Sequence, residues 1–324
     1  MPTVYFGGLA YSAEAGETVL EALERGGAKV PSSCRSGVCQ TCLVKATTGP
    51  VPERAQQGLK PVWKSQGYLL ACMCPALDGL SLDDVAATLA VDAKIESVNA
   101  LSASVRRVHL GVPPDFHFQA GQFVNVTRPS DGVTRPYSIA NLPGQNRIEL
   151  HVALVEGGDM SHWLAASAGE AVTLRGPCGE CVYLAGQPDE PLLLAGTGTG
   201  LAPLLGVARD ALAQNHAAPI HLYHGSRLSS GIYLLDELRE LETQHENLHV
   251  YALALDNDSA RDDVTQADLV AQVTDRLKGL PNARVYLCGS PDIVRMLKKK
   301  AYLGGTPLAQ IHSDPFVQAP TRAG

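Results

Sequence analysis

Three cysteines lie within eleven residues, SSCRSGVCQTC at 32–42, at positions Cys34, Cys39 and Cys42. Thiols this close along a chain either ligate a metal centre or form disulfides. Eight cysteines among 324 residues are far fewer than a disulfide-stapled secreted domain carries, and the start of the chain lacks a basic segment followed by an apolar one. The spacing therefore predicts a metal centre in a reducing compartment, and such a centre needs a fourth thiolate.

The spacing C-x4-C-x2-C with a distant fourth cysteine is typical of 2Fe-2S clusters. Two candidates for the fourth ligand, Cys72 and Cys74, follow Cys42 after 29 and 31 intervening residues. Residues 1–90 resemble the plant-type ferredoxin domain in CRSGVCQTC and in GYLLAC, and in that family the last gap is normally 29. The resemblance implies a β-grasp fold with Cys34, Cys39, Cys42 and Cys72 as the cluster ligands.

The loop between the cysteines is built from small residues, among them Ser32, Ser33, Ser36 and Gly37. Such residues let the backbone wrap closely with its N–H groups aimed at the sulfurs, which stabilises added negative charge. Gln40 stands where the family usually has glycine. The alternative is a four-cysteine zinc site or a set of buried thiols, but zinc sites prefer C-x2-C pairs on both sides and only one is present.

The net charge is −7, from 26 basic and 33 acidic residues, which argues against nucleic acid as a main partner. No window of the sequence approaches a membrane span. We therefore expect a cytoplasmic protein that acts without membrane or nucleic acid, and a monomer is the default expectation.

The chain divides into three expected units, at 1–91, 92–187 and 188–324. In the first, residues 3–6 and 9–13 predict a hairpin, and ETVLEALERGG predicts a helix in which Thr18 and Glu21 form a capping box. From Ala93 onward, short strands separated by turn signals favour an antiparallel β-barrel. After the break GQPDEP, strands alternate with helices, which is typical of a doubly wound parallel sheet.

The segment RPYS at 135–138 ends a predicted barrel strand and offers three kinds of contact to a flavin. Arginine pairs with a phosphate, tyrosine stacks on a ring, and a serine hydroxyl can donate to a ring nitrogen. Further on, EGGDMSHWL opens a predicted helix whose free N–H groups favour a pyrophosphate, so FAD fits better than FMN. The alternative is that Arg135 and Tyr137 are ordinary surface residues.

Residues 92–324 resemble the ferredoxin–NADP reductase superfamily, whose flavin motif is R-x-Y-S followed by a helix start with Gly and Ser. The resemblance implies a flavin-binding barrel and a nucleotide-binding domain. The flavin contacts that it implies are Arg135, Pro136, Tyr137, Ser138, Gly157, Gly158, Met160 and Ser161.

The stretch GPCGEC at 176–181 contains a C-x2-C that could indicate a redox or zinc site. The same superfamily has G-P-x-G here, so Gly176, Pro177 and Gly179 explain the stretch. We expect Cys178 and Cys181 to be small packing residues.

An apolar strand, a glycine-rich turn and a helix, LLLAGTGTGLAPLLGVARD, form the context in which glycines cradle phosphates. The glycines do not follow G-x-G-x-x-G but resemble the superfamily's G-T-G-x-A-P. The alternative is a tight turn with no ligand. The turn YHGSRLSSGIY has no carboxylate for the ribose, so the choice between NADH and NADPH stays open, with a slight preference for NADH by analogy with oxygenase reductases.

The resemblance also places a late Cys-Gly pair beside the nicotinamide and an aromatic residue near the C-terminus over a flavin face. The nucleotide contacts that it implies are Gly198, Thr199, Gly200, Ala202, Pro203, Ser226, Arg227, Cys288 and Gly289, and Phe316 is the aromatic residue. Of these, Cys288, together with Ser138, is expected near the reacting rings.

The order of the three motif sets resembles the reductase components of multicomponent aromatic-ring oxygenases and hydrocarbon monooxygenases. The expected activity is electron transfer from NAD(P)H through FAD and a 2Fe-2S cluster to an oxygenase or ferredoxin partner. Because the cofactors supply the reactivity, no general base or nucleophile is expected. Two alternatives are a stand-alone reductase of a small-molecule acceptor, such as a flavin, a ferric chelate or a deoxysugar intermediate, and a non-enzymatic redox sensor.

Overall fold

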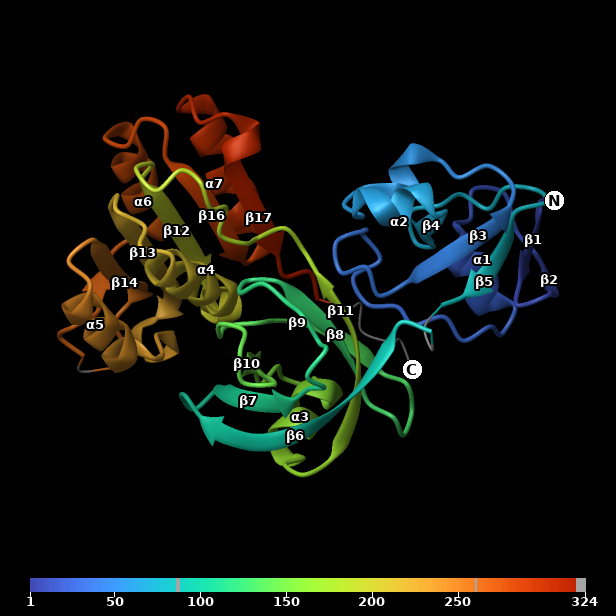
Figure 1. Cartoon of the computed structure of the whole chain (residues 1–324), viewed down its shortest axis with the longest axis horizontal. Coiled ribbons are helices and arrows are strands. Elements are labelled where there is room, and N and C mark those ends of the chain that lie inside the picture. Colours follow the sequence, from blue (N-terminus) through green and yellow to red (C-terminus); the bar gives the residue numbers. More distant parts are fainter. Residues whose placement is uncertain (86–87, 260, 319–324) are drawn as a thin grey trace.

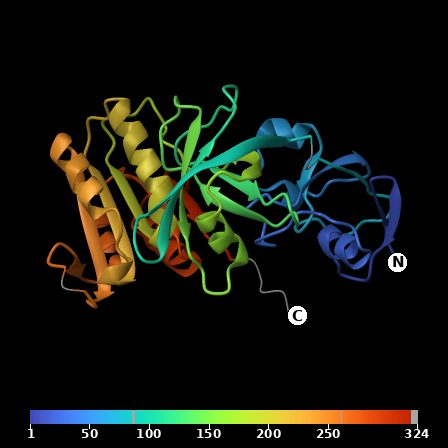
Figure 2. The ribbon, with the colours of Figure 1, turned by 90° about the horizontal axis from the view of Figure 1, so that it is seen from below.

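The computed structural model describes residues 1–85, 88–259 and 261–318 and consists of three units in a row (Figures 1 and 2). A barrel lies in the middle, the N-terminal unit lies on one side of it and the C-terminal unit on the other. Among the described residues, no helix has the length and apolar character needed to span a membrane.

The N-terminal unit is a five-stranded mixed sheet with the order β2-β1-β5-β3-β4, in which β1 and β5 are parallel. The predicted hairpin and helix are confirmed, and the Thr18 hydroxyl accepts from the Glu21 N–H as the capping box requires. The elements are β1 (Thr3–Phe6), β2 (Leu9–Ser12), α1 (Val19–Arg25), β3 (Leu43–Thr48), the 3₁₀ turn η1 (Glu53–Gln56), α2 (Pro61–Ser65), β4 (Tyr68–Leu70) and β5 (Ser81–Asp84).

The middle unit is a six-stranded antiparallel sheet with the order β10-β7-β6-β11-β8-β9. A bridge between Ile139, just after β9, and Leu150 of β10 brings the two edge strands together and closes the barrel. Its elements are β6 (Ala90–Ala100), β7 (Val105–Gly111), β8 (Phe123–Thr127), β9 (Thr134–Ser138), β10 (Arg147–Ala153), α3 (Asp159–Ala166) and β11 (Ala171–Cys178).

The C-terminal unit is a six-stranded parallel sheet with the order β15-β14-β13-β12-β16-β17. The strand order reverses between β12 and β16, and ligands bind at such a switch point in open α/β sheets. Its elements are β12 (Leu192–Thr197), the 3₁₀ turn η2 (Gly198–Gly200), α4 (Leu201–Ala213), β13 (Ile220–Leu228), η3 (Ser229–Gly231), α5 (Leu235–Gln244), β14 (Leu248–Asp256), β15 (Thr265–Gln266), α6 (Leu269–Lys278), β16 (Arg284–Gly289), α7 (Pro291–Leu303), η4 (Leu308–Gln310) and β17 (Ile311–Pro315).

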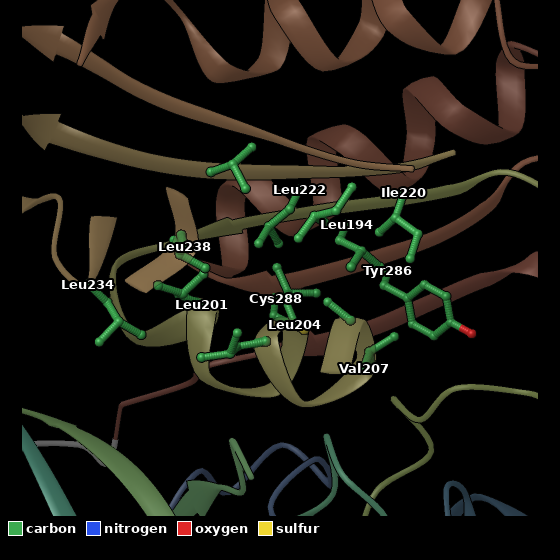
Figure 3. Close-up of a cluster of buried hydrophobic side chains, with 14 of the residues drawn as sticks. Leu194, Leu201, Leu204, Val207, Ile220, Leu222, Leu234, Leu238, Tyr286 and Cys288 are labelled. Carbon is green, nitrogen blue, oxygen red and sulfur yellow. The ribbon is translucent and has the colours of Figure 1, made fainter. Parts of the chain in front are cut away.

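The core of the C-terminal unit lies between the sheet and α4 (Figure 3). Leu201, Leu204 and Val207 of α4 pack against Leu194 and Leu222 of the sheet. Cys181 and Tyr183, which follow the barrel strand β11, belong to the same core as Leu192 at the start of β12.

The barrel and the C-terminal unit are also joined by a buried polar network around Glu149 of β10. Its carboxylate is 2.9 Å from His151 Nε2 and 3.4 Å from Arg107 Nε. Arg107 also binds Glu237 of α5 at 2.7 Å, and His151 Nδ1 lies 3.0 Å from the hydroxyl of Tyr233. These contacts fix the barrel against the nucleotide-binding fold.

Candidate cofactor sites and the path between them

Four buried thiols meet in the N-terminal unit as two pairs, and each has an exposed fraction of 8% or less. Cys34 and Cys39 form one pair, whose shared hydrogen bond lowers the pKa of the Cys34 thiol to about 4 and raises that of Cys39. Cys42 and Cys72 form the other, in which the same kind of bond raises the pKa of Cys42 and lowers that of Cys72. Two pairs are the donor set that two irons require.

Cys74 does not join these pairs. Its side chain is fully buried, its Sγ lies 3.4 Å from the Pro75 carbonyl oxygen, and burial raises its pKa to about 11. By contrast, the N–H of Cys72 points at Cys42 Sγ over 3.5 Å. Within the described ranges, no group of three or more His, Cys, Asp or Glu side chains is placed to hold a metal ion.

The backbone of the cysteine loop is folded around the sulfurs. The N–H groups of Ser36 and Cys39 both lie 3.4 Å from Cys34 Sγ, and the buried Ser33 hydroxyl has no hydrogen-bond partner among the described residues. Gln40 adopts φ +54°, the left-handed region that glycine occupies more easily, and its amide donates to the Gly58 carbonyl at 2.9 Å. This hydrogen bond stabilises the left-handed backbone conformation at Gln40. A glycine, which plant-type ferredoxin domains usually have here, would adopt that conformation without such a bond.

One side of this loop is covered by the barrel. Asn125 of β8 donates to the Cys39 carbonyl at 3.0 Å and accepts from the Thr41 hydroxyl at 2.8 Å. The guanidinium of Arg175, on β11, donates to the carbonyls of Gln40 and Thr41. Sequence reasoning missed Asn125 and Arg175, because neither belongs to a motif and both act only through this docking.

The flavin motif lies on β9, and Ser138 ends that strand. The Ser138 hydroxyl lies 3.4 Å from Asp314 Oδ2 of β17, so the structure brings a barrel residue and a residue of the C-terminal unit together. Tyr137 packs on the barrel core, and burial raises the pKa of its hydroxyl. Arg135 donates to the Thr134 carbonyl at 2.8 Å.

The helix α3 begins after Gly157 and Gly158, and Gly157 has φ +66°. The Ser161 hydroxyl accepts from the Val155 N–H at 3.2 Å and donates to the Gly158 carbonyl at 2.8 Å, which closes the turn. Met160 is buried in the barrel core. Arg128, which sequence reasoning missed, pairs with Asp159 at the start of this helix and with Asp131.

The glycine turn Gly198–Gly200 follows β12 at the switch point and lies against the end of β16. A Cβ on Gly200 would lie 2.5 Å from the Cys288 carbonyl oxygen, and one on Gly289, at φ +108°, would lie 2.5 Å from the Thr197 carbonyl oxygen. Only glycine fits at these two crossings. Ala202 and Pro203 are buried in the first turn of α4.

The other residues that the sequence predicts to bind the nicotinamide nucleotide lie at the carboxyl ends of the strands. Ser226 and the exposed Arg227 end β13, two strands away from Cys288. Cys288 Sγ lies 3.4 Å from Cys181 Sγ, so Cys181 packs directly on the end of β16. Phe316 is half-buried, and its N–H donates to the Gly289 carbonyl at 2.7 Å. Residues 319–324 of the tail lie outside the described residues.

A cavity of about 370 Å³ opens where the three units meet. Gly37 and Gln40 of the cysteine loop, Phe123 of β8, Cys181, and Ser313 and Asp314 of β17 contribute to its wall. Burial raises the pKa of the Asp314 carboxyl to about 7, although the hydrogen bond from Ser138 opposes this. This volume lies in the range of small-molecule and cofactor sites.

The comparisons with known proteins identify all three units. Residues 7–77 match the 2Fe-2S iron-sulfur cluster binding domain, 92–183 the oxidoreductase FAD-binding domain and 194–299 the oxidoreductase NAD-binding domain. The reductase subunit of an aromatic O-demethylase from an Amycolatopsis species is 32% identical, over 98% of both chains. The chain belongs to the ferredoxin–NADP reductase superfamily. It is an oxidoreductase that uses FAD, a 2Fe-2S cluster and NAD(P)H.

Further relatives of this reductase also match it over nearly its full length. The ferredoxin–NAD(P)+ reductase component of naphthalene 1,2-dioxygenase/salicylate 5-hydroxylase systems from a Ralstonia species is 30% identical, over 94% of this chain and 95% of that one. A solved cytochrome P450 reductase from Amycolatopsis is 29% identical with a TM-score of 0.68, covering 98% and 99%. A ferredoxin reductase in carbazole 1,9a-dioxygenase, at 24% identity and TM-score 0.67, covers 97% and 98% and shows the fold.

Proposed function

We propose that this reductase is the electron-transfer component of an oxygenase system: it oxidises NADH and delivers electrons one at a time to a separate oxygenase or ferredoxin. The observation that carries the proposal is the contact of the cysteine loop with the flavin barrel, at a cavity walled by all three units. A reductase of a small-molecule acceptor would need the same cofactors, so the acceptor class is tested separately. The names of two relatives, the reductase subunit of an aromatic O-demethylase and the reductase component of naphthalene 1,2-dioxygenase/salicylate 5-hydroxylase systems, point to the same class of acceptor.

For the cluster, we propose that Cys34 and Cys39 hold one iron and that Cys42 and Cys72 hold the other. The pairing of the thiols and the N–H groups around them support this assignment. Cys74 is left out of the proposed ligand set because its thiol donates to the Pro75 carbonyl oxygen at 3.4 Å and is fully buried.

For the flavin, we propose that Tyr137 and Ser138 face the ring and that Arg135 and the start of α3 bind the phosphates. Support comes from the place of Ser138 beside Asp314 near the cavity and from the free N–H groups of a helix start. The proposed contacts are Arg135, Pro136, Tyr137, Ser138, Gly157, Gly158, Met160 and Ser161, with Phe316 over a ring face.

For the nicotinamide nucleotide, we propose binding at the switch point between β12 and β16, with the phosphates over the glycine turn and the nicotinamide beside Cys288. The two tight glycine crossings support this place, because they let the turn after β12 lie directly against the end of β16 at the switch point. The proposed contacts are Gly198, Thr199, Gly200, Ala202, Pro203, Ser226, Arg227, Cys288 and Gly289.

When bound, the cofactors supply the redox chemistry, which is a hydride from NADH to FAD and single electrons from FAD to the cluster. The protein orients them. Cys288, held by Cys181, positions the nicotinamide side, and Ser138, held by Asp314, positions the flavin side. Asn125 and Arg175 hold the cysteine loop at the barrel. The proposal has the chain act as a cytoplasmic monomer with a preference for NADH.

The test is an anaerobic titration of the purified protein with NADH, with visible absorption following the flavin and electron paramagnetic resonance following the cluster. We expect both centres to become reduced, a signal of the 2Fe-2S type, and a higher kcat/KM for NADH than for NADPH. A flavin that bleaches without any cluster signal would contradict the proposed relay. Light scattering of the same sample measures the oligomeric state.

The acceptor class needs a second measurement. With Cys72→Ser, reduction of ferricyanide by NADH should persist, because the flavin can reduce it, whereas reduction of the one-electron protein acceptor cytochrome c should fall. Equal reduction of cytochrome c by this variant and by the wild type would favour a reductase that works from its flavin, as the small-molecule alternative requires.

A further inference from the structure

Arg175 is a buried cation at the boundary between the barrel and the cysteine loop. It lies on β11, belongs to the flavin barrel, and is only 6% exposed. Its Nη2 lies 3.2 Å from the Gln40 carbonyl oxygen and also donates to the Thr41 carbonyl. Both acceptors stand between Cys39 and Cys42 in the sequence, so the guanidinium is held against the proposed cluster ligands.

Besides burial, the ionisable groups that act on the pKa of the Arg175 guanidinium are, in order of size, the thiols of Cys178, Cys42 and Cys39 and the Asp84 carboxyl. Each of these four groups favours the charged form of the arginine. Burial lowers the pKa of the guanidinium, but an arginine stays protonated in proteins.

A buried charge without a compensating charge is strongly destabilising. Two of the groups that attract Arg175 are proposed ligands of the cluster, and thiolates that bind iron carry negative charge. The cluster is therefore the natural counter-charge of this guanidinium. Reduction adds one more negative charge at the same place, and a nearby cation stabilises the reduced form more than the oxidised form.

We propose that Arg175 is a positioning residue that raises the reduction potential of the cluster while the N-terminal unit is docked on the barrel, and so favours electron transfer from the flavin. This inference rests on the proposed function. Because Arg175 belongs to the barrel and not to the cluster unit, its effect depends on docking. The hydrogen bonds from Asn125 and Arg175 to the same loop are what maintain that arrangement.

The test compares holoprotein variants by a redox titration in which electron paramagnetic resonance follows the cluster and visible absorption follows the flavin. In Arg175→Gln we expect the cluster midpoint to fall so that the flavin-to-cluster equilibrium changes about tenfold, which is about 59 mV for one electron. The flavin midpoint should stay unchanged. Arg175→Lys keeps the charge and should retain most of the wild-type midpoint.

The matched control is Arg147→Gln, which removes an arginine from the barrel strand β10 that binds only Gln145 through its side chain in the described structure. It should leave the cluster midpoint unchanged. Iron and FAD contents are measured for every variant, so a loss of cofactor is not read as a change of potential. If Arg175→Gln does not fold, Arg175→Lys still tests the inference. Because Arg175→Lys keeps the charge, a fall of about 59 mV in its cluster midpoint would refute the inference.

A cluster midpoint in Arg175→Gln equal to that of the wild type overturns the inference. So does an equal fall in Arg175→Gln and Arg175→Lys, since the hydrogen bonds and not the charge would then set the potential. Both results leave the proposed function intact as long as NADH reduces the wild-type cluster. Absence of a cluster signal in the wild type, in contrast, would remove the proposed function itself.

Discussion

Replacing Glu149 by glutamine tests the network that joins the barrel to the nucleotide-binding unit. The Glu149 side chain is 11% exposed and faces His151, Arg107 and Arg209. Burial alone would raise the pKa of this carboxyl, but the hydrogen bond from His151 and the nearby charges lower it from 4.5 to about 2. At about 1.4 kcal/mol per pH unit, the ionised carboxylate contributes about 3 kcal/mol to stability.

The direction of the pH dependence of stability follows from the lowered pKa of Glu149. The contribution is fully present above pH 4.5 and is lost as the pH falls toward 2. Glutamine resembles the protonated carboxyl, so Glu149→Gln should lower the free energy of unfolding by about 3 kcal/mol at pH 7, and by the same amount at pH 6 and pH 8.

Urea denaturation of the holoprotein followed by circular dichroism measures this loss, with the slope of the transition recorded for each variant. The matched control is Glu170→Gln, which changes an exposed carboxylate of the same barrel. A loss below about 0.5 kcal/mol, the usual size of a surface substitution, would refute the reasoning. A loss that differs between pH 6 and pH 8 would refute it as well.

Three further predictions concern the cofactor sites. Cys72→Ser should lose the iron and the cluster signal, whereas Cys74→Ser should keep both, as iron analysis and electron paramagnetic resonance will report. Gly200→Ala places a methyl group 2.5 Å from the Cys288 carbonyl oxygen, so the KM for NADH should rise in steady-state kinetics while the iron content stays unchanged. Because the pKa of Asp314 is raised from 3.8 to about 7, the neutral form is favoured in the fold, and wild-type stability should fall as the pH rises from 4 to 7. Asp314→Asn should lack this decline in urea denaturation; the same pH profile in both proteins would contradict the assignment.

Local patterns were enough to predict much of the architecture. The capping box of Thr18 and Glu21, the alternation of short strands in the barrel and the strand-helix order after residue 191 each depend on residues close in sequence, and the structure contains all three. The choice of Cys72 over Cys74 came from the spacing and the resemblance, and it stays a proposal that the paired thiols support.

Contacts between the units could not be predicted in the same way. Arg175 and Asn125 carry no local signal, because their role exists only where β11 and β8 meet a loop more than 80 residues away in sequence. Cys181 was expected to be a packing residue, and its contact with Cys288 depends on how the barrel linker meets β16. Arg35 of the cysteine loop pairs with Glu24 of α1 at 2.7 Å, a contact for which the sequence carries no local signal.

The cysteine loop has two unequal sides. Residues 39–41 are buried under the barrel, whereas Arg35 remains exposed to solvent. An acceptor that approaches the exposed side while the units stay docked would therefore meet Arg35, whose charge is paired with Glu24. The side of the loop that receives electrons is therefore fixed by contacts within the chain. Among the residues that the structure describes, the exposed side makes no such contacts with the barrel and can differ between reductases that serve different partners.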